Sequence, residues 1–163
     1  LPHLQFVLGG SGWGENVDLP PNVRYVGHVY TRDHNAFNCS PSTVLNVNRD
    51  SMARFGWSPP TRVFEAAGAG ACLVCDAWEG IEDFLEPGRE VLRVASGAEL
   101  AALLPELGAG RARAIGAAAR ERVLAQHTYR HRAAELHALL ESGAGLVRRP
   151  PQRVGAGLRA AAE

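Results

Sequence analysis

Apolar and polar positions along the chain predict strands that alternate with helices. Short apolar or alternating runs predict five strands, at residues 4–8, 23–27, 43–49, 71–75 and 90–94. Helical patterns predict short helices at 33–39 and 81–85, a longer helix from a Ser58 cap through Pro59 and Pro60 to about Gly68, and three C-terminal helices from Ala98 onward. Residues 50–57 are predicted as loop and Pro87-Gly88 as a turn. The alternation predicts an α/β fold with a parallel sheet.

Length and charge narrow the classes of protein. The 163 residues suffice for one well-packed domain, which we place at residues 1–142, and the Ala, Gly, Arg and Pro content predicts a flexible tail at 143–163. Seventeen basic and seventeen acidic side chains cancel, so we expect no nucleic-acid partner. No apolar run is long enough for a membrane span, and Leu1-Pro2-His3 is not a signal sequence. We therefore expect a cytoplasmic chain, either a fragment or a stand-alone module.

The stretch from Ser58 to Glu82 is the candidate site. It places a helix N-terminus, the carboxylate of Glu65 and the carboxyl end of the fourth predicted strand close together. Open α/β sheets bind ligands at that edge. Asp76 and a loop containing Gly80 follow the strand.

Arg62 and Glu65 are the most informative side chains of this stretch. A cation in the first turn of a helix faces the positive end of the helix dipole, and a bound phosphate reverses that penalty. The alternative is an i,i+3 ion pair with Glu65, worth about 0.2–0.5 kcal/mol. Gly68 and Gly70 favour close packing of the helix on the strand, where the two oxygens of Glu65 would be satisfied by the vicinal hydroxyls of a ribose.

Other motifs point away from redox, NAD and metal chemistry. Gly10-x-Gly12 lacks the third glycine and the following helix of a dinucleotide fingerprint. Cys72 and Cys75 form C-x-x-C inside a predicted strand, where they would face opposite sides of the sheet. His127 and His131 lack the glutamate of a zinc-protease motif, and Thr128 between them is a plausible helix cap. We expect no cofactor and no metal.

The run LNVNRDSMARFGWSPPTRVFEAAGAGACLVCDAWEGIEDFLEPGREVL closely resembles the C-terminal, donor-binding half of two-domain (GT-B) glycosyltransferases, in particular the group related to the spore-maturation protein CgeB. The resemblance covers about Leu4 to Arg132, and its most specific piece is R-x-F-E-A-x-x-x-G. It implies a Rossmann-like parallel sheet of about five strands, flanked by helices and completed by C-terminal helices. It also implies a nucleoside-diphosphate sugar as donor, an unknown acceptor, and an N-terminal acceptor domain outside this chain.

The resemblance also implies roles for individual residues. Glu65 corresponds to the carboxylate that holds the nucleotide ribose, and Arg62 and Arg49 are candidates for the phosphates. The remaining candidates are Gly12 and Trp13 for the pyrophosphate loop, Gly27, His28 and Val29 for the base edge, and Gly80, Ile81 and Glu82 for the sugar side. Trp57 departs from the Glu-x7-Glu pattern of many relatives, which leaves the contacts to the sugar open.

The sequence therefore predicts a metal-independent glycosyltransferase domain in which Arg62 and Glu65 are the catalytic candidates, and which alone binds nucleotide but transfers no sugar. Two alternatives remain open. One is a nucleotide-binding or regulatory module that kept the fold without turnover, and the other is a purely structural α/β domain.

Overall fold

The computed structural model describes residues 1–11, 13 and 17–142. It divides the chain into two units, Leu1–Thr128 and Tyr129–Glu163. The first unit contains the strands of the described residues, and the described part of the second is helix α6 (Tyr129–Glu141) and Ser142. The domain boundary predicted at residue 142 stays a prediction, and the predicted tail at 143–163 lies outside the described residues.

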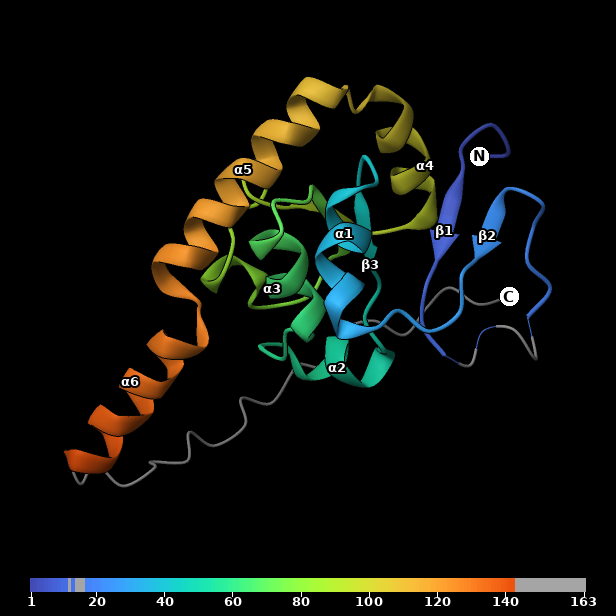
Figure 1. Cartoon of the computed structure of the whole chain (residues 1–163). Helices are drawn as coiled ribbons and strands as arrows, with labels where there is room; N and C mark the ends of the chain where they lie inside the picture. The colour runs from blue at the N-terminus through green and yellow to red at the C-terminus, as the bar shows by residue number, and fades with distance from the viewer. Residues whose placement is uncertain (12, 14–16, 143–163) are drawn as a thin grey trace. The chain divides into compact units, whose positions relative to one another are not determined.

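Five short parallel strands form in the first unit. β1 (Phe6–Leu8) pairs with β2 (Val23–Tyr25), as Figure 1 shows, and β4 (Leu73–Asp76) lies between β3 (Val44–Asn46) and β5 (Leu92–Val94). The predicted parallel α/β arrangement is confirmed. The strands are divided between a two-stranded and a three-stranded sheet, because no hydrogen-bonded ladder joins β1 to β3 within the described residues.

The three-stranded sheet has a buried core on each face. On one face, α3 (Thr61–Gly68) and part of α5 (Ala109–Gln126) pack against Leu73 and Cys75. On the other face, α4 (Gly97–Glu106) and the beginning of α5 pack against Cys72 and Val74. The two thiols therefore lie in different cores, which confirms that Cys72 and Cys75 face opposite sides of the sheet.

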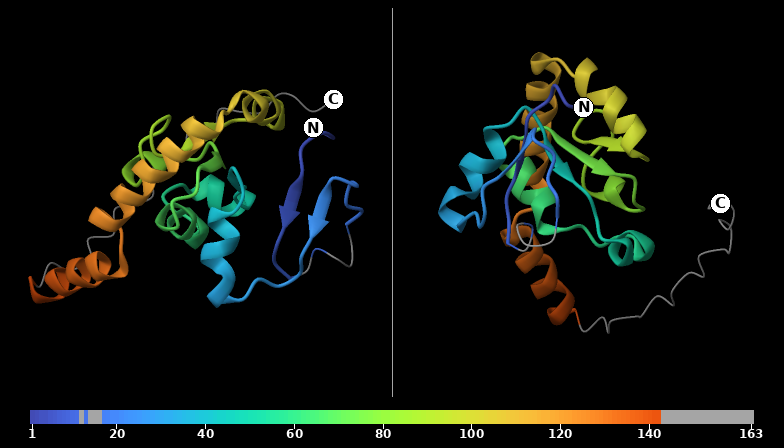
Figure 2. Two further views of the ribbon diagram at one scale, coloured as in Figure 1. Left: turned by 45° about the horizontal axis from the view of Figure 1, so that its top comes forward. Right: turned by 90° about the vertical axis from the view of Figure 1, so that its right-hand side faces the viewer.

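Helix α3 can pack close to α5 because residue 116 of α5 is a glycine. A Cβ atom on Gly116 of α5 would lie 2.1 Å from the carbonyl oxygen of Gly70, directly after α3. A glycine at position 116 therefore lets α5 run alongside α3, as the views in Figures 1 and 2 show. The sequence predicted that Gly68 and Gly70 favour close packing of this helix on the following strand, but a Cβ on Gly68 would meet nothing within 4 Å.

Residues 50–57, predicted as loop, contain the six-residue helix α2 (Asp50–Phe55). Arg49 is extended at the N-cap, Asp50 supplies a negative charge in the first turn, and the amides of Met52 and Ala53 donate to the Arg49 carbonyl. Ala53 also packs against the core. The prediction missed this helix because so short a segment has too little sequence to establish a period.

Helix α3 begins later than predicted. Ser58 does not cap it, because the helix starts at Thr61 and the residue at its N-cap is Pro60, with φ −67° and ψ 149°. A residue that precedes proline is disfavoured in helical conformation, so the Pro59-Pro60 pair keeps the chain extended up to the cap. Shorter helices complete the first unit: η1 (Thr31–Asp33), α1 (His34–Cys39) and η2 (Ile81–Asp83).

Candidate functional site

The carboxyl ends of β3 and β4 are joined by a polar contact. The backbone N–H of Asn48 donates to Oδ1 of Asp76 at 3.1 Å, and Nδ2 of Asn46 donates to Oδ1 of Asn48 at 3.0 Å. Both asparagines are buried, and within the described residues Asn46 Oδ1 and Asn48 Nδ2 make no hydrogen bond. These contacts hold in place the end of β3 and the residues that directly precede Arg49. Sequence reasoning missed the asparagines, whose only signal was their alternation with Leu45 and Val47.

Glu65 lies on the exposed part of α3, beside α1. Its Oε2 is 3.9 Å from Nδ1 of His34, and the two side chains are 46% and 38% exposed respectively. The other ring nitrogen of His34, Nε2, lies 3.1 Å from the carbonyl oxygen of Val29. One imidazole thus connects the residue predicted for the ribose with the segment predicted for the base edge. Sequence reasoning missed His34 as well.

The tautomer of His34 decides what it presents to Glu65. A carbonyl oxygen accepts hydrogen bonds only, so Nε2 must carry the proton that it donates to Val29. In the neutral ring, Nδ1 then turns a lone pair toward the carboxylate. A neutral His34 therefore donates nothing to Glu65, whose oxygens stay open to a ligand donor.

Arg62 and Arg49 are exposed cations that have no side-chain partner among the described residues. Arg62 is the second residue of α3, and the i,i+3 ion pair with Glu65 does not form. Arg49 stands at the N-cap of α2. Neither guanidinium makes a side-chain hydrogen bond or an ion pair with any of the described residues. Both remain available to an anion.

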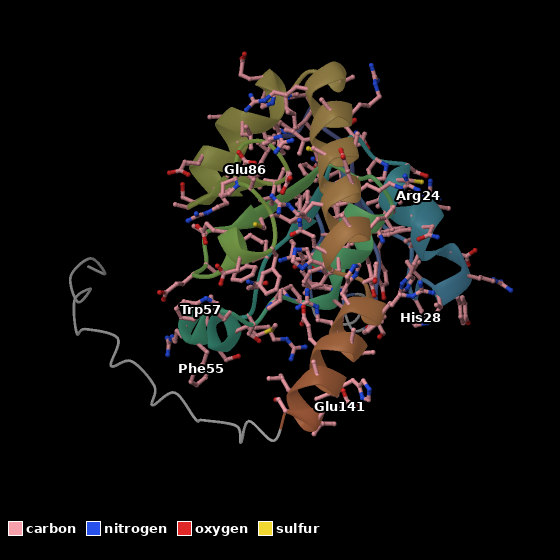
Figure 3. The ribbon with its side chains drawn as sticks, turned by 90° about the vertical axis from the view of Figure 1, so that its left-hand side faces the viewer. Arg24, His28, Phe55, Trp57, Glu86 and Glu141 are labelled. Carbon is pink, nitrogen blue, oxygen red and sulfur yellow. The ribbon has the colours of Figure 1, made fainter. Side chains whose placement is uncertain are left out.

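The predicted base-edge segment, residues 27–29, is hydrogen-bonded to the loop that contains Gly10. The Gly10 amide donates to the Gly27 carbonyl at 2.8 Å, and both glycines have positive φ. His28 is exposed, at the edge of the fold labelled in Figure 3, with its ring 4.7 Å from that of Tyr30 in a T-shaped arrangement. Trp13 is about half exposed, and Gly12 lies outside the described residues.

Other parts of the protein contact all three residues that were predicted for the sugar side. Ile81 is fully buried in the core, and Glu82 forms an ion pair with Arg93 of β5. Gly80, with φ 99°, is buried beneath the ring of Trp57. Trp57 itself was not recognised as a site candidate either.

Comparison with known proteins places the chain in a family. Residues 1–138 match the model of the family described as glycosyl transferase-like, and the chain belongs to that family. The sequence matches no curated protein. Helices able to cross a membrane, by length and apolar content, are absent from the described residues.

Two solved structures share the fold. The Anabaena protein HepE, solved in complex with UDP-glucose, has a TM-score of 0.67 at 16% identity, over 87% of this chain and 42% of that one. Sucrose-phosphate synthase from Thermosynechococcus elongatus has a TM-score of 0.62 at 19% identity, over 76% of this chain and 30% of that one. The chain therefore spans less than half the length of either protein. These likenesses confirm the fold class, a Rossmann-like half of a GT-B fold.

Proposed function

We propose that this chain is the C-terminal, donor-binding half of a GT-B glycosyltransferase of the CgeB-related group. It binds a nucleoside-diphosphate sugar, and the acceptor comes to an N-terminal domain of the parent protein. The family supports glycosyl transfer, and the UDP-glucose bound to HepE is a donor of this class.

The observation that carries the proposal is the contact of His34 with both Val29 and Glu65. These two residues were predicted, separately, for the base edge and the ribose. In a nucleoside the base and the ribose hydroxyls are a few ångströms apart, so residues that bind them must be neighbours. The half-exposed carboxylate of Glu65 then accepts from the ribose hydroxyls, while the backbone near Val29 meets the base.

Arg62 and Arg49 supply the electrostatic part of the mechanism. Glycosyl transfer leaves negative charge on the diphosphate as the bond to the sugar breaks. Two guanidinium groups that have no partner among the described residues, one of them in the first turn of α3, stabilise that charge as it develops. These groups take the place of a divalent ion, so transfer is metal-independent and chelation leaves nucleotide affinity unchanged. The chain alone binds the donor and transfers no sugar.

Replacing Glu65 with Ala tests the ribose assignment. We expect nucleoside-diphosphate affinity to fall by about 1–3 kcal/mol, because the carboxylate accepts hydrogen bonds from the ribose. Isothermal titration calorimetry with UDP, GDP and ADP measures the change, and thermal melting confirms that the variant is folded. Glu106→Ala, an exposed carboxylate at the end of α4, is the matched control. Equal affinities of Glu65→Ala and the unmodified chain would remove Glu65 from the site.

A further inference from the structure

Trp57 has a strained backbone. Its φ of 42° is the only positive value among the described residues other than glycine. A bulky L-residue pays about 1–2 kcal/mol for this conformation, and such strain persists only where the surroundings enforce it. Here the Trp57 amide donates to the Glu79 carbonyl at 2.8 Å and so ties the end of α2 to the loop after β4.

The indole ring is held at its five-membered ring by two contacts. Its Nε1 donates to Oδ2 of Asp83 at 3.0 Å, and its five-membered ring covers Gly80, where a Cβ atom would lie 2.5 Å from Cδ1. The Gly80 position therefore has to be a glycine for the ring to lie flat on the loop. Trp57 as a residue is nonetheless 54% exposed, and Phe55, two residues earlier, is 82% exposed. Figure 3 shows both at the same edge of the fold.

A role in the core does not account for this arrangement. Trp78, in the same loop region, is 3% exposed and is a core residue. Trp57 instead combines a strained backbone, a satisfied N–H and a face open to solvent. A ring held in one orientation has little rotational freedom left to lose when a ligand covers it.

We infer that the exposed face of Trp57 is a stacking platform for a sugar ring. A pyranose presents C–H groups on its faces and hydroxyl groups around its rim, so it matches a flat apolar ring surrounded by hydrogen-bond acceptors. The exposed carboxylate of Glu79 lies on the loop that Trp57 contacts and supplies such an acceptor. The inference rests on the proposed function, because a glycosyltransferase binds the sugar of its donor and, where the acceptor is a glycan, a second sugar. The platform takes either the sugar of the donor or a sugar of the acceptor.

The experiment uses the full 163-residue chain and the variants Trp57→Leu and Trp57→Phe. Calorimetry compares three pairs of ligands, UDP with UDP-glucose, GDP with GDP-mannose, and ADP with ADP-glucose. Nitrogen-15 NMR follows the indole N–H signal of Trp57, assigned by its loss in Trp57→Phe, during titration with the same ligands and with maltotetraose and cellotetraose. Tyr129→Ala, which removes an exposed aromatic ring from the second unit, is the control.

If the platform takes the donor sugar, Trp57→Leu lowers affinity for the sugar nucleotide about 3- to 10-fold, the range of an aromatic contact, and leaves affinity for the bare diphosphate within about 2-fold. If it takes an acceptor sugar, an oligosaccharide shifts the Trp57 indole signal and Trp57→Leu abolishes binding. Trp57→Phe retains part of the affinity in either case. The inference is overturned if no sugar ligand shifts the indole signal, or if Trp57→Leu binds every sugar ligand as the unmodified chain does. Failure of all three bare diphosphates to bind would instead overturn the proposed function.

Discussion

His34 links the two segments that form the candidate nucleoside site. It reaches the Val29 carbonyl with one ring nitrogen and the Glu65 carboxylate with the other, and it belongs to neither segment. The contact with Val29 orients the ring, and the ring in turn limits the positions open to the carboxylate. His34 is a positioning residue in this account, because it acts on the nucleotide through Glu65 and Val29.

Replacing His34 with Ala should weaken nucleoside-diphosphate binding about 2- to 10-fold, the effect of losing the one modest hydrogen bond that orients the ring. A double-mutant cycle with Glu65→Ala measures the coupling: His34→Ala should cost less affinity when Glu65 is already absent. His137→Ala, an exposed histidine of α6 paired with Glu141, is the control. Fully additive effects of the two substitutions would contradict the positioning role.

Candidate site residues could be proposed from the sequence where a single segment indicates them. Glu65 and Arg62 were selected as candidates because both lie in one helix of distinctive composition. The structure leaves both side chains exposed, and their roles stay predictions. His34, Asn46 and Trp57 were missed, since their significance depends on partners that are distant along the chain or on a backbone angle. Asn48 and Asp76, for example, are joined across 28 positions of sequence.

At the scale of elements, β4 is the best predicted part of the fold. Its continuous apolar run predicts a strand buried on both faces, and its residues indeed lie in two cores. The ends of α2 and α3 were predicted less well. Two adjacent prolines suit either the first turn of a helix or an extended segment before it, and the choice depends on contacts made by the folded chain.

The placement of β4 predicts the reactivity of the cysteines. Cys39 is exposed, whereas Cys72 and Cys75 are buried. One thiol of the native chain should therefore react quickly with a disulfide reagent such as DTNB, and the other two only after unfolding. Absorbance of the released thiolate counts the reactive groups, and Cys39→Ala should abolish the fast phase. Fast reaction of more than one thiol in the native chain would contradict the buried strand.

The same burial predicts a loss of stability in alkali. Burial, with a contribution from Asp76, raises the pKa of the Cys75 thiol from 9.0 to about 12. Between those values the unfolded chain loses a proton that the native chain retains, so the free energy of unfolding should fall as pH rises, by about 1.4 kcal/mol per pH unit. Urea unfolding at a series of pH values measures the slope. It should be shallower in Cys75→Ala and unchanged in Cys39→Ala.

At the scale of the whole molecule, the fold class was predicted and the pairing of the sheets was not. Alternation of strands and helices is a local property that the sequence displays, and the parallel strands confirm the interpretation. The separation of β1 and β2 from the other strands depends on backbone pairing across the chain, which apolar periodicity does not encode. The chain spans 42% and 30% of the two solved proteins that share its fold, and a second, acceptor-binding half belongs to the proposal alone.

The central claim is that a nucleoside diphosphate binds between the base-edge segment and α3, and backbone amide NMR tests it most directly. The 163-residue chain is titrated with UDP, GDP and ADP, each with and without EDTA. We predict that one of the three shifts the amide signals of residues 27–29, His34 and 61–66, saturably and equally in both conditions. Absence of shifts in these segments with all three nucleotides, or shifts confined to other elements, would contradict the account.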